Sequence, residues 1–339
     1  YTIADKEWQK YAMHFGGGGD AGEQATLAAY LADYEAYFED NTTYGGHVDT
    51  YLKVSSDPIS PVVFDEVNDR IRDGVSLITF FGHASTEGFD QNIDNPDNWG
   101  NTGKYPIVIG LGCYAGDFHQ PYQTSASEKF VRLADQGAVA FISTVKVGFT
   151  NGLDNYTDRF YQAFTDTLYG KSIGEVSQWA KAQSTNLSHV SESGSIGNLS
   201  IQGDPALRLN PHNAPELVLD PSRVFIEPES ISVATDSIDL NVVITNIGQA
   251  IRDTIGLEIT RNFPNGADSI YLIDVPESGY LDTVVIRMPL EPTIAEGINT
   301  FTIEVDLPSD YPEQYDDFNN NRITHEEYIQ LDGLEPIWS

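Results

Sequence analysis

The sequence predicts an α/β domain followed by an antiparallel β-sandwich. Three continuous apolar runs, at residues 75–81, 106–111 and 138–142, are typical of parallel strands that are covered on both faces. Apolar residues recur with helical spacing between and around these runs, at residues 23–38, 64–71, 125–134, 154–168 and 173–182. This alternation indicates a mostly parallel sheet with helices on both faces, which we expect over residues 1–210.

From about residue 215 the helical spacing is replaced by short alternating segments. We expect strands at residues 216–219, 238–245, 254–261, 269–274, 281–288 and 299–306, with turn signals between them. Strands of this length and spacing are typical of an antiparallel sandwich of about 100 residues. The second domain is therefore expected at residues 215–330, after a Pro-bounded linker at residues 211–215.

The chain is strongly acidic, with 51 acidic and 18 basic residues among 339 and a net charge of −33. Such a surface excludes a nucleic-acid binder held by phosphate contacts and argues against attachment to anionic membranes. No apolar run approaches the ~20 residues that span a bilayer. There is no signal peptide, and the chain opens at Tyr1 without Met, as expected of a processed or excised piece.

The candidate reactive residues each follow a buried strand. His83 comes just after the run 75–81, and Cys113, the one cysteine, comes just after the run 106–111. Ligands bind at the carboxyl ends of strands in open α/β sheets, so the two side chains meet if these strands are neighbours. An imidazole can then take the thiol proton. The alternative is a buried structural cysteine and an unrelated loop histidine.

Several segments around these residues resemble the gingipain family of cysteine peptidases, whose core is caspase-like. The matching segments, in order, are Gly82-His83, residues 112–118 (GCYAGDF), Ser127-Glu128, residues 137–143 (GAVAFIS) and residues 203–207 (GDPAL). The resemblance implies Cys113 as the nucleophile and His83 as its proton-transferring partner. It also implies an oxyanion hole formed by the backbone N–H groups of Cys113 and Ala84.

The chain departs from the family pattern at three points. Ala84 stands where the family usually has glycine. An acid that orients the histidine is expected in the loop after the first strand, where both Asp20 and Glu23 are candidates. A further α/β subdomain that precedes the family's core has no counterpart here, so an amino-terminal subdomain is expected to be missing.

The loop after the third apolar run is expected to line the substrate pocket, through Thr144, Val145 and Lys146. We hypothesise that Lys146 points into this pocket and favours an acidic or small side chain before the cleaved bond. The alternative is a lysine that faces solvent.

No cofactor is required by this chemistry, and no spacing of His, Cys or Asp matches a zinc site. Two oxygen-rich loops, residues 94–98 and 316–321, could hold a structural calcium ion, although neither has the EF-hand pattern. Solvated loops are the alternative at both places.

The second domain resembles the immunoglobulin-like sandwiches of bacterial cell-adhesion proteins. The resembling segments are residues 242–248 (VVITNIG), 301–306 (FTIEVD) and 317–321 (DFNNN). It contains no nucleophile paired with a base, and we expect a spacer or contact module.

Together these observations predict a secreted or cell-surface bacterial cysteine endopeptidase that acts on proteins or peptides through an acyl-enzyme. Two alternatives stay open. One is a sortase-like transpeptidase of type IX secretion, which passes the acyl group to an amine. The other is a non-catalytic cell-surface or adhesion protein built on a peptidase scaffold. Neither nucleic acid nor membrane insertion is expected.

Overall fold

The computed structural model describes residues 6–54, 61–91, 93, 95–186, 188–209, 212–229, 231, 235–306, 311–313 and 320–330. The chain divides into two compact units, Tyr1–Pro211 and His212–Ser339. Asp94 and residues 316–319, named above as parts of oxygen-rich loops, lie outside the described residues.

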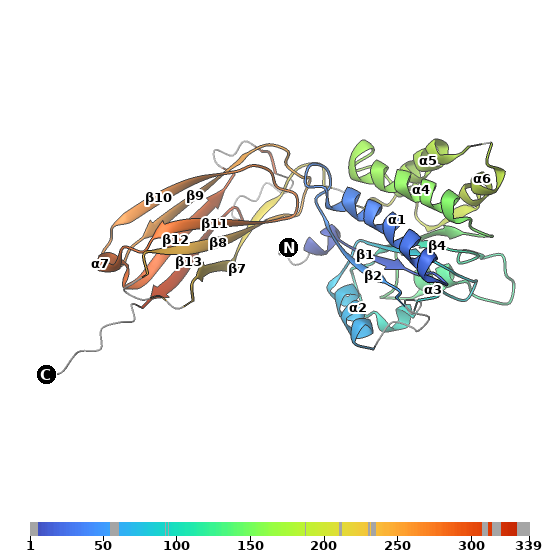
Figure 1. The fold of residues 1–339 in the computed structure, drawn as a ribbon, viewed down its shortest axis with the longest axis horizontal. Helices are drawn as coiled ribbons and strands as arrows, with labels where there is room; N and C mark the ends of the chain where they lie inside the picture. The colour runs from blue at the N-terminus through green and yellow to red at the C-terminus, as the bar shows by residue number, and fades with distance from the viewer. Residues whose placement is uncertain are drawn as a thin grey trace. The chain divides into compact units, whose positions relative to one another are not determined.

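The first unit is built on one six-stranded sheet in the order β2-β1-β3-β4-β5-β6 (Figure 1). Strands β1 to β5 are parallel, and β6 runs antiparallel to β5 at the edge. Their bounds are Tyr11–Gly16 (β1), His47–Leu52 (β2), Leu77–Phe81 (β3), Ile107–Leu111 (β4), Ala140–Thr144 (β5) and Leu199–Gly203 (β6). The predicted mostly parallel sheet is confirmed.

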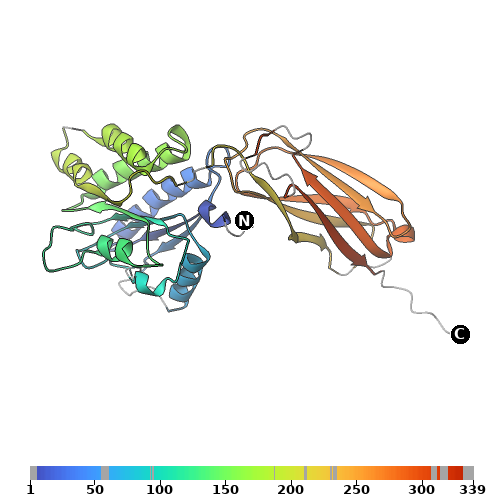
Figure 2. The same ribbon diagram turned by 180° about the vertical axis from the view of Figure 1, so that it is seen from behind.

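Helices cover both faces of this sheet (Figures 1 and 2). One face carries α1 (Ala21–Glu39), α4 (Thr150–Gln162), α5 (Ile173–Ser184) and α6 (Val190–Gly197), and the other carries α2 (Pro61–Asp73) and α3 (Ala126–Arg132). Short helical turns occur at Glu7–Lys10, Pro96–Asn98 and Ala163–Thr167. α3 and α5 each begin with a reciprocal Ser–Glu cap, in which the serine accepts from the Glu N–H and the Glu carboxylate accepts in return.

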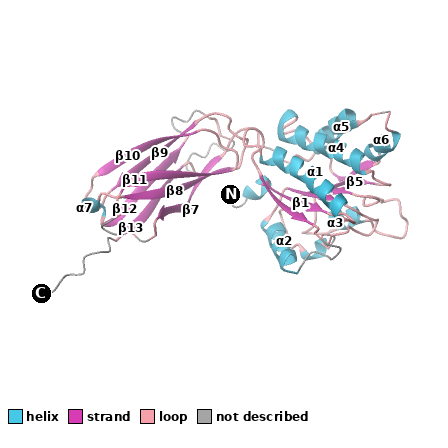
Figure 3. Ribbon diagram, viewed as in Figure 1, coloured by secondary structure: helices cyan, strands magenta, loops and turns pink. Residues whose placement is uncertain are grey.

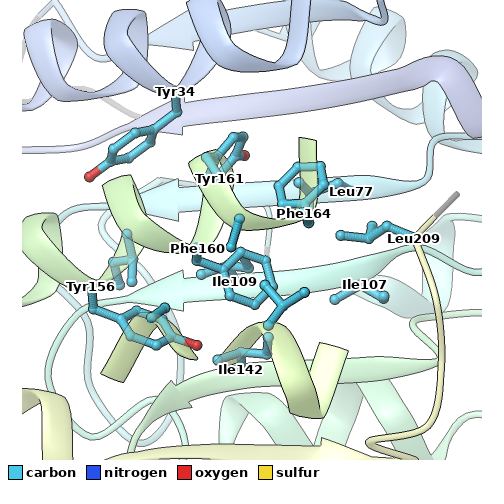
Figure 4. Close-up of a cluster of buried hydrophobic side chains, with 14 of the residues drawn as sticks. Tyr34, Leu77, Ile107, Ile109, Ile142, Tyr156, Phe160, Tyr161, Phe164 and Leu209 are labelled. Carbon is cyan, nitrogen blue, oxygen red and sulfur yellow. The ribbon is translucent and has the colours of Figure 1, made fainter. Parts of the chain in front are cut away.

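The larger core lies between the sheet and the α1–α4 side (Figure 4). Leu77, Ile109 and Ile142 project from β3, β4 and β5 against Tyr156 and Phe160 of α4. Because every residue of β3, β4 and β5 is buried, these strands need apolar side chains on both faces, which explains the continuous apolar runs. This packing holds the carboxyl ends of the three strands in place.

The second unit is a β-sandwich of two antiparallel sheets (Figure 3). One has the order β10-β9-β12-β13 and the other β11-β8-β7. The bounds are Leu217–Glu227 (β7), Ser237–Asn246 (β8), Ile255–Asn262 (β9), Asp268–Val275 (β10), Leu281–Pro289 (β11), Gly297–Val305 (β12) and Arg322–Ile329 (β13), with a helical turn α7 at Pro292–Ala295. The inner faces share one core, and the predicted immunoglobulin-like sandwich is confirmed.

Apart from the short helical turns, α6, β6 and β13 were not predicted from the sequence. α6 contains two glycines and three serines, so its helical spacing is weak. β6 is an edge strand whose residues are mostly half-buried, and β13 alternates between exposed and half-buried residues along most of its length. None of the three carries the long apolar pattern by which strands and helices are recognised.

Candidate active site

The loops that follow β3 and β4 bring His83 and Cys113 to one edge of the sheet. The two strands are parallel neighbours, and Phe81 is paired with Leu111. His83 and Cys113 each come two residues after this pair, so the two chains leave the sheet in matching register. The predicted neighbouring arrangement of their strands is therefore present.

The loop after β3 and the loop after β4 are in direct contact at Gly82 and Gly112. The N–H of Gly82 donates to the Leu111 carbonyl at 3.1 Å. A Cβ on Gly112 would lie 2.5 Å from the Cβ of Ala84 and 2.9 Å from the carbonyl oxygen of Gly82. The residue before Cys113 thus packs against the residue after His83, and any side chain on Gly112 would push the two loops apart.

Cys113 is half-buried, and its thiol donates to the carbonyl of Gly148 at 3.7 Å. The following residue, Tyr114, has φ of 62°, in the left-handed region that non-glycine residues rarely occupy. Its N–H donates to the Lys146 carbonyl at 2.9 Å. The backbone therefore turns sharply at the cysteine, a kind of local strain that often occurs at functional sites.

The His83 ring is largely exposed and is held by a carboxylate from α1. Its Nε2 lies 3.0 Å from Oε2 of Glu23, in the first turn of that helix. The same oxygen accepts from the N–H of Gly19 at 2.7 Å. Since a carboxylate accepts only, Nε2 is the donor, and Nδ1 is left for another partner.

The other acid named from the sequence, Asp20, has a different place. It is the N-cap of α1, and its Oδ1 accepts from the N–H groups of Gly22 at 2.9 Å and Glu23 at 3.0 Å. An Asp at this position satisfies amides that the helix leaves without partners. Of the two candidates, Glu23 therefore contacts His83, and Asp20 fixes the start of the helix that carries Glu23.

The backbone amides named for an oxyanion hole lie in these same two loops. Ala84 faces Phe89 in a short antiparallel bridge. In this bridge the Ser85 N–H donates to the Gly88 carbonyl, and the Asp90 N–H donates to the His83 carbonyl. Among the described residues, the N–H groups of Ala84 and Cys113 donate to no backbone carbonyl.

A cavity of about 590 Å³ opens beside His83. It is lined by the loop that follows β3 and by one residue of α3, and its lining residues are His83, Ala84, Ser85, Glu87, Gly88, Phe89, Asp90 and Lys129. Of these residues, His83 and Ala84 were predicted from the sequence to belong to the site. The cavity gives an extended chain room to lie next to the imidazole.

The loop after β5 runs alongside the cysteine loop. Thr144 is fully buried, and its hydroxyl donates to the Gly112 carbonyl, whereas Val145 is half-buried and donates its N–H to Asn198 at 3.1 Å. Lys146 is exposed. Of the three residues named for a substrate pocket, Thr144 thus braces the cysteine loop, and Lys146 is the one with an exposed side chain.

Sequence reasoning considered Asp90 only as a weak metal ligand and missed its structural role, which is to connect the segments beside the site. Its Oδ2 accepts from the Gly18 N–H at 3.0 Å and pairs with Nζ of Lys53 at 3.2 Å. Its own N–H donates to the His83 carbonyl at 2.9 Å. One carboxylate thus joins the segments that follow β1, β2 and β3. This role cannot be recognised from the sequence, where Asp90 is one acid in a polar loop.

The described part of the chain contains no group of three or more His, Cys, Asp or Glu side chains arranged to hold a metal ion. None of its helices is long and apolar enough to cross a bilayer.

The model of peptidase family C25 matches residues 1–210, and no curated protein matches the chain. Among solved structures, the Arg-specific cysteine proteinase gingipain R is similar, with a TM-score of 0.51 and 12% identity, covering 96% of this chain and 68% of that one.

A complex of the pro- and mature domains of RgpB from Porphyromonas gingivalis is also similar, with a TM-score of 0.50 and 13% identity. It covers 96% of this chain and 70% of that one. At such identities the structural likeness shows the fold alone, and the match of the family model over most of the chain shows the family. The chain belongs to peptidase family C25, the gingipain family of cysteine peptidases.

Proposed function

We propose that the chain is a secreted cysteine endopeptidase in which Cys113 is the nucleophile, His83 the general acid and base, and Glu23 the residue that orients the imidazole. The observation that carries this proposal is the arrangement at the sheet edge. Two neighbouring strands deliver the thiol and the imidazole in matching register, and the imidazole is held by a carboxylate 3.0 Å away. An imidazole oriented by a carboxylate can activate a thiol that comes within its reach.

The proposed mechanism follows from the different roles of the two ring nitrogens of His83. With Nε2 donating to Glu23, Nδ1 of His83 takes the proton of the Cys113 thiol. The thiolate attacks the peptide carbonyl carbon, and the carbonyl electron pair moves onto oxygen. The N–H groups of Cys113 and Ala84 stabilise this oxyanion; losing one such donor costs roughly 3–4 kcal/mol in studied cases.

The tetrahedral intermediate then collapses, and the C–N bond breaks. His83 gives its proton from Nδ1 to the leaving amine, which leaves an acyl group on the Cys113 sulfur. Water, deprotonated by the same nitrogen, attacks the thioester, and the thiol is restored. Glu23 supports the imidazolium at both proton transfers without becoming protonated itself.

We propose that Lys146 sets a preference for an acidic or small side chain before the cleaved bond. Its loop lies against the cysteine loop, its carbonyl accepts from Tyr114, and its side chain is exposed. In Lys146→Glu, cleavage after acidic residues in a peptide library should fall at least about tenfold. An unchanged preference would remove Lys146 from the pocket.

The dyad is tested by alkylation, because Cys113 is the one thiol in the chain. A thiolate paired with imidazolium reacts with iodoacetamide well below the pH range around 8.5 at which free thiols ionise. We expect the wild type to be alkylated rapidly at pH 6 and to cleave peptides. His83→Ala should move the alkylation profile to that of a free thiol, and Cys113→Ser should abolish cleavage.

His119→Ala is the matched control, because this histidine lies in the loop after β4 but makes no contact with Glu23. It should leave both measurements unchanged. A wild-type thiol that titrates like a free one, together with no cleavage of any library peptide, would contradict the proposal and favour a peptidase scaffold without activity.

A further inference from the structure

The cavity beside His83 is lined by a lysine that the proposed chemistry does not use. Its lining residues come from the loop after β3, here called the histidine loop (residues 82–91), and from α3, which contributes Lys129. No described lining residue belongs to the loop after β4 or the loop after β5. The cavity therefore lies along the histidine loop and does not include the surface around Cys113 and Lys146.

The histidine loop is fixed against α3 and the segment before it. The N–H of Ala126 donates to the Thr86 carbonyl at 2.7 Å. Nζ of Lys129 donates to the Glu87 carbonyl at 2.7 Å, and Nε2 of Gln123 donates to Oε1 of Glu87 at 2.9 Å. These three hydrogen bonds hold the Lys129 ammonium in a defined position in the wall of the cavity.

The Lys129 ammonium has hydrogen-bonding capacity left. An ammonium group has three N–H donors, and the Glu87 carbonyl uses one of them. Lys129 is half-buried, and it forms no ion pair with any residue that the structure describes. The group can therefore donate to a carboxylate that enters the cavity.

The two acids that line the cavity have other partners. Oδ2 of Asp90 pairs with Nζ of Lys53 at 3.2 Å, so the charge of Asp90 is compensated. The carboxylate of Glu87 is exposed and accepts from Gln123. Since water screens an exposed carboxylate more than a half-buried group, Glu87 offsets the positive potential at Lys129 only in part.

The place of the cavity indicates which part of a peptide it receives. In the proposed mechanism the acyl part of the substrate stays on Cys113, whose thiol donates to the Gly148 carbonyl in the loop after β5 at 3.7 Å. The amine part departs next to His83, which gives it a proton. Because His83 lines the cavity and no described residue of the loop after β5 does, the cavity lies on the side of the leaving amine.

We propose that this cavity binds the segment that follows the cleaved bond, and that Lys129 selects an acidic side chain in that segment. Lys146 lies on the other side of the bond, so peptides with Asp or Glu after the cleaved bond, and an acidic or small residue before it, become the preferred substrates. The assignment to the leaving side rests on the proposed peptidase function, whereas the binding of an acidic peptide beside Lys129 does not.

Peptide binding by the Cys113→Ala chain tests the proposal without requiring cleavage. The probes are three fluorescein-labelled octapeptides of alanine that carry two Asp, two Asn or two Lys residues at their fifth and sixth positions. Fluorescence anisotropy is measured at ~0.15 M NaCl, where the net charge of −33 is screened beyond about 8 Å. We expect the Asp peptide to bind about fivefold more tightly than the Asn peptide, and the Lys peptide to bind most weakly. Lys129→Met should remove this ratio, Lys129→Glu should reverse it, and Lys129→Arg should retain it.

The matched control is Lys104→Glu. Lys104 is also half-buried, and its Nζ also donates to a backbone carbonyl, that of Asp73, at 2.6 Å. The substitution changes the net charge by the same amount outside the cavity and should leave the three affinities unchanged. Gln123→Ala controls for the histidine loop, because it removes a hydrogen bond to Glu87 but keeps the ammonium. It should retain the ratio between the Asp and Asn peptides even where both affinities fall.

Equal affinities for the Asp and Asn peptides, or a ratio that Lys129→Met leaves unchanged, would overturn the proposal. The wild type, offered the same octapeptides, reports on the peptidase function separately. Cleavage directly before the acidic pair, with a higher kcat/KM for the Asp peptide, would support both proposals, and cleavage after the pair would overturn the assignment to the leaving side. Binding that depends on Lys129 without any cleavage would contradict the peptidase function and support an acidic-peptide site at this cavity.

Discussion

The carboxylate of Asp90, in the loop that carries His83, forms an ion pair with Lys53, with Oδ2 and Nζ 3.2 Å apart. Both side chains are mostly buried. The other carboxylate oxygen, Oδ1, fills the space next to Gly82, where a Cβ would approach it to 2.7 Å. The ion pair thus occupies the position at which three strand ends converge.

Breaking this ion pair should disturb the site without touching the reacting groups. In Asp90→Asn the hydrogen bond to Gly18 can persist, but Lys53 keeps a largely buried charge without its partner. We expect a loss of about 3 kcal/mol of stability, typical of a buried ion pair that loses one member, and at least a tenfold fall in kcat/KM. Urea unfolding and peptide hydrolysis measure the two effects.

The double variant Asp90→Asn/Lys53→Met separates charge from packing. If the cost comes from the unpaired ammonium, the double variant should recover most of the lost stability. A double variant as unstable as Asp90→Asn alone would show that the ion pair is not the cause.

The two acids after β1 should respond differently to substitution. Glu23→Gln removes the charge that supports the His83 imidazolium, so Cys113 alkylation should move to higher pH and kcat should fall at least about tenfold. Asp20→Ala removes the helix cap and should cost about 1 kcal/mol of stability.

Asp20→Ser is the control for both, because serine retains the cap. Its pH profile of alkylation and its unfolding midpoint should match those of the wild type. A shifted pH profile in Asp20→Ser with none in Glu23→Gln would reverse the assignment of the orienting acid.

Gly112→Ala should separate the histidine and cysteine loops, because the new Cβ would overlap the side chain of Ala84. We expect a loss of about 1–3 kcal/mol of stability, as for other overpacked sites, and a strong fall in peptide hydrolysis. Gly194→Ala is the control, since a Cβ there meets no atom within 4 Å and lies in α6. It should stabilise the protein slightly, because alanine favours helix.

The half-buried Asp154 should make stability depend on pH. Burial raises its pKa from 3.8 to about 6, while its Oδ1 accepts from the Tyr34 hydroxyl at 2.9 Å. Between pH 3.8 and 6 the folded chain binds a proton that the unfolded chain has lost, so this group's contribution to stability falls as the pH rises and is fully lost above pH 6.

Asp154→Asn keeps an acceptor for Tyr34 and removes the charge. The variant should be more stable than the wild type by about 1–2 kcal/mol at pH 8, a figure reduced for partial exposure, and the gain should shrink toward pH 4.5. Urea unfolding across this range checks it, with exposed Asp97→Asn as the control. A gain that is constant with pH would contradict the assignment.

Much of the first unit can be predicted from the sequence because its strands are buried on both faces. The apolar runs locate β3, β4 and β5, and the helical spacing locates α1 and α5. Polar residues that are buried in the core cannot be identified from such apolar patterns. His14 of β1 looks incidental in the sequence, yet it is fully buried, its Nε2 lies 2.8 Å from the Tyr161 hydroxyl, and burial lowers its pKa to about 3.

The sequence by itself determined that a thiol and an imidazole follow buried strands and are rimmed by glycine, since strand ends and glycines are local features. Only the tertiary structure decided that β3 lies beside β4, that Glu23 and not Asp20 reaches His83, and that Asp90 joins three strand ends. The reason is physical: these contacts join residues up to 72 positions apart, and their partners are chosen by the packing of the sheet and its helices.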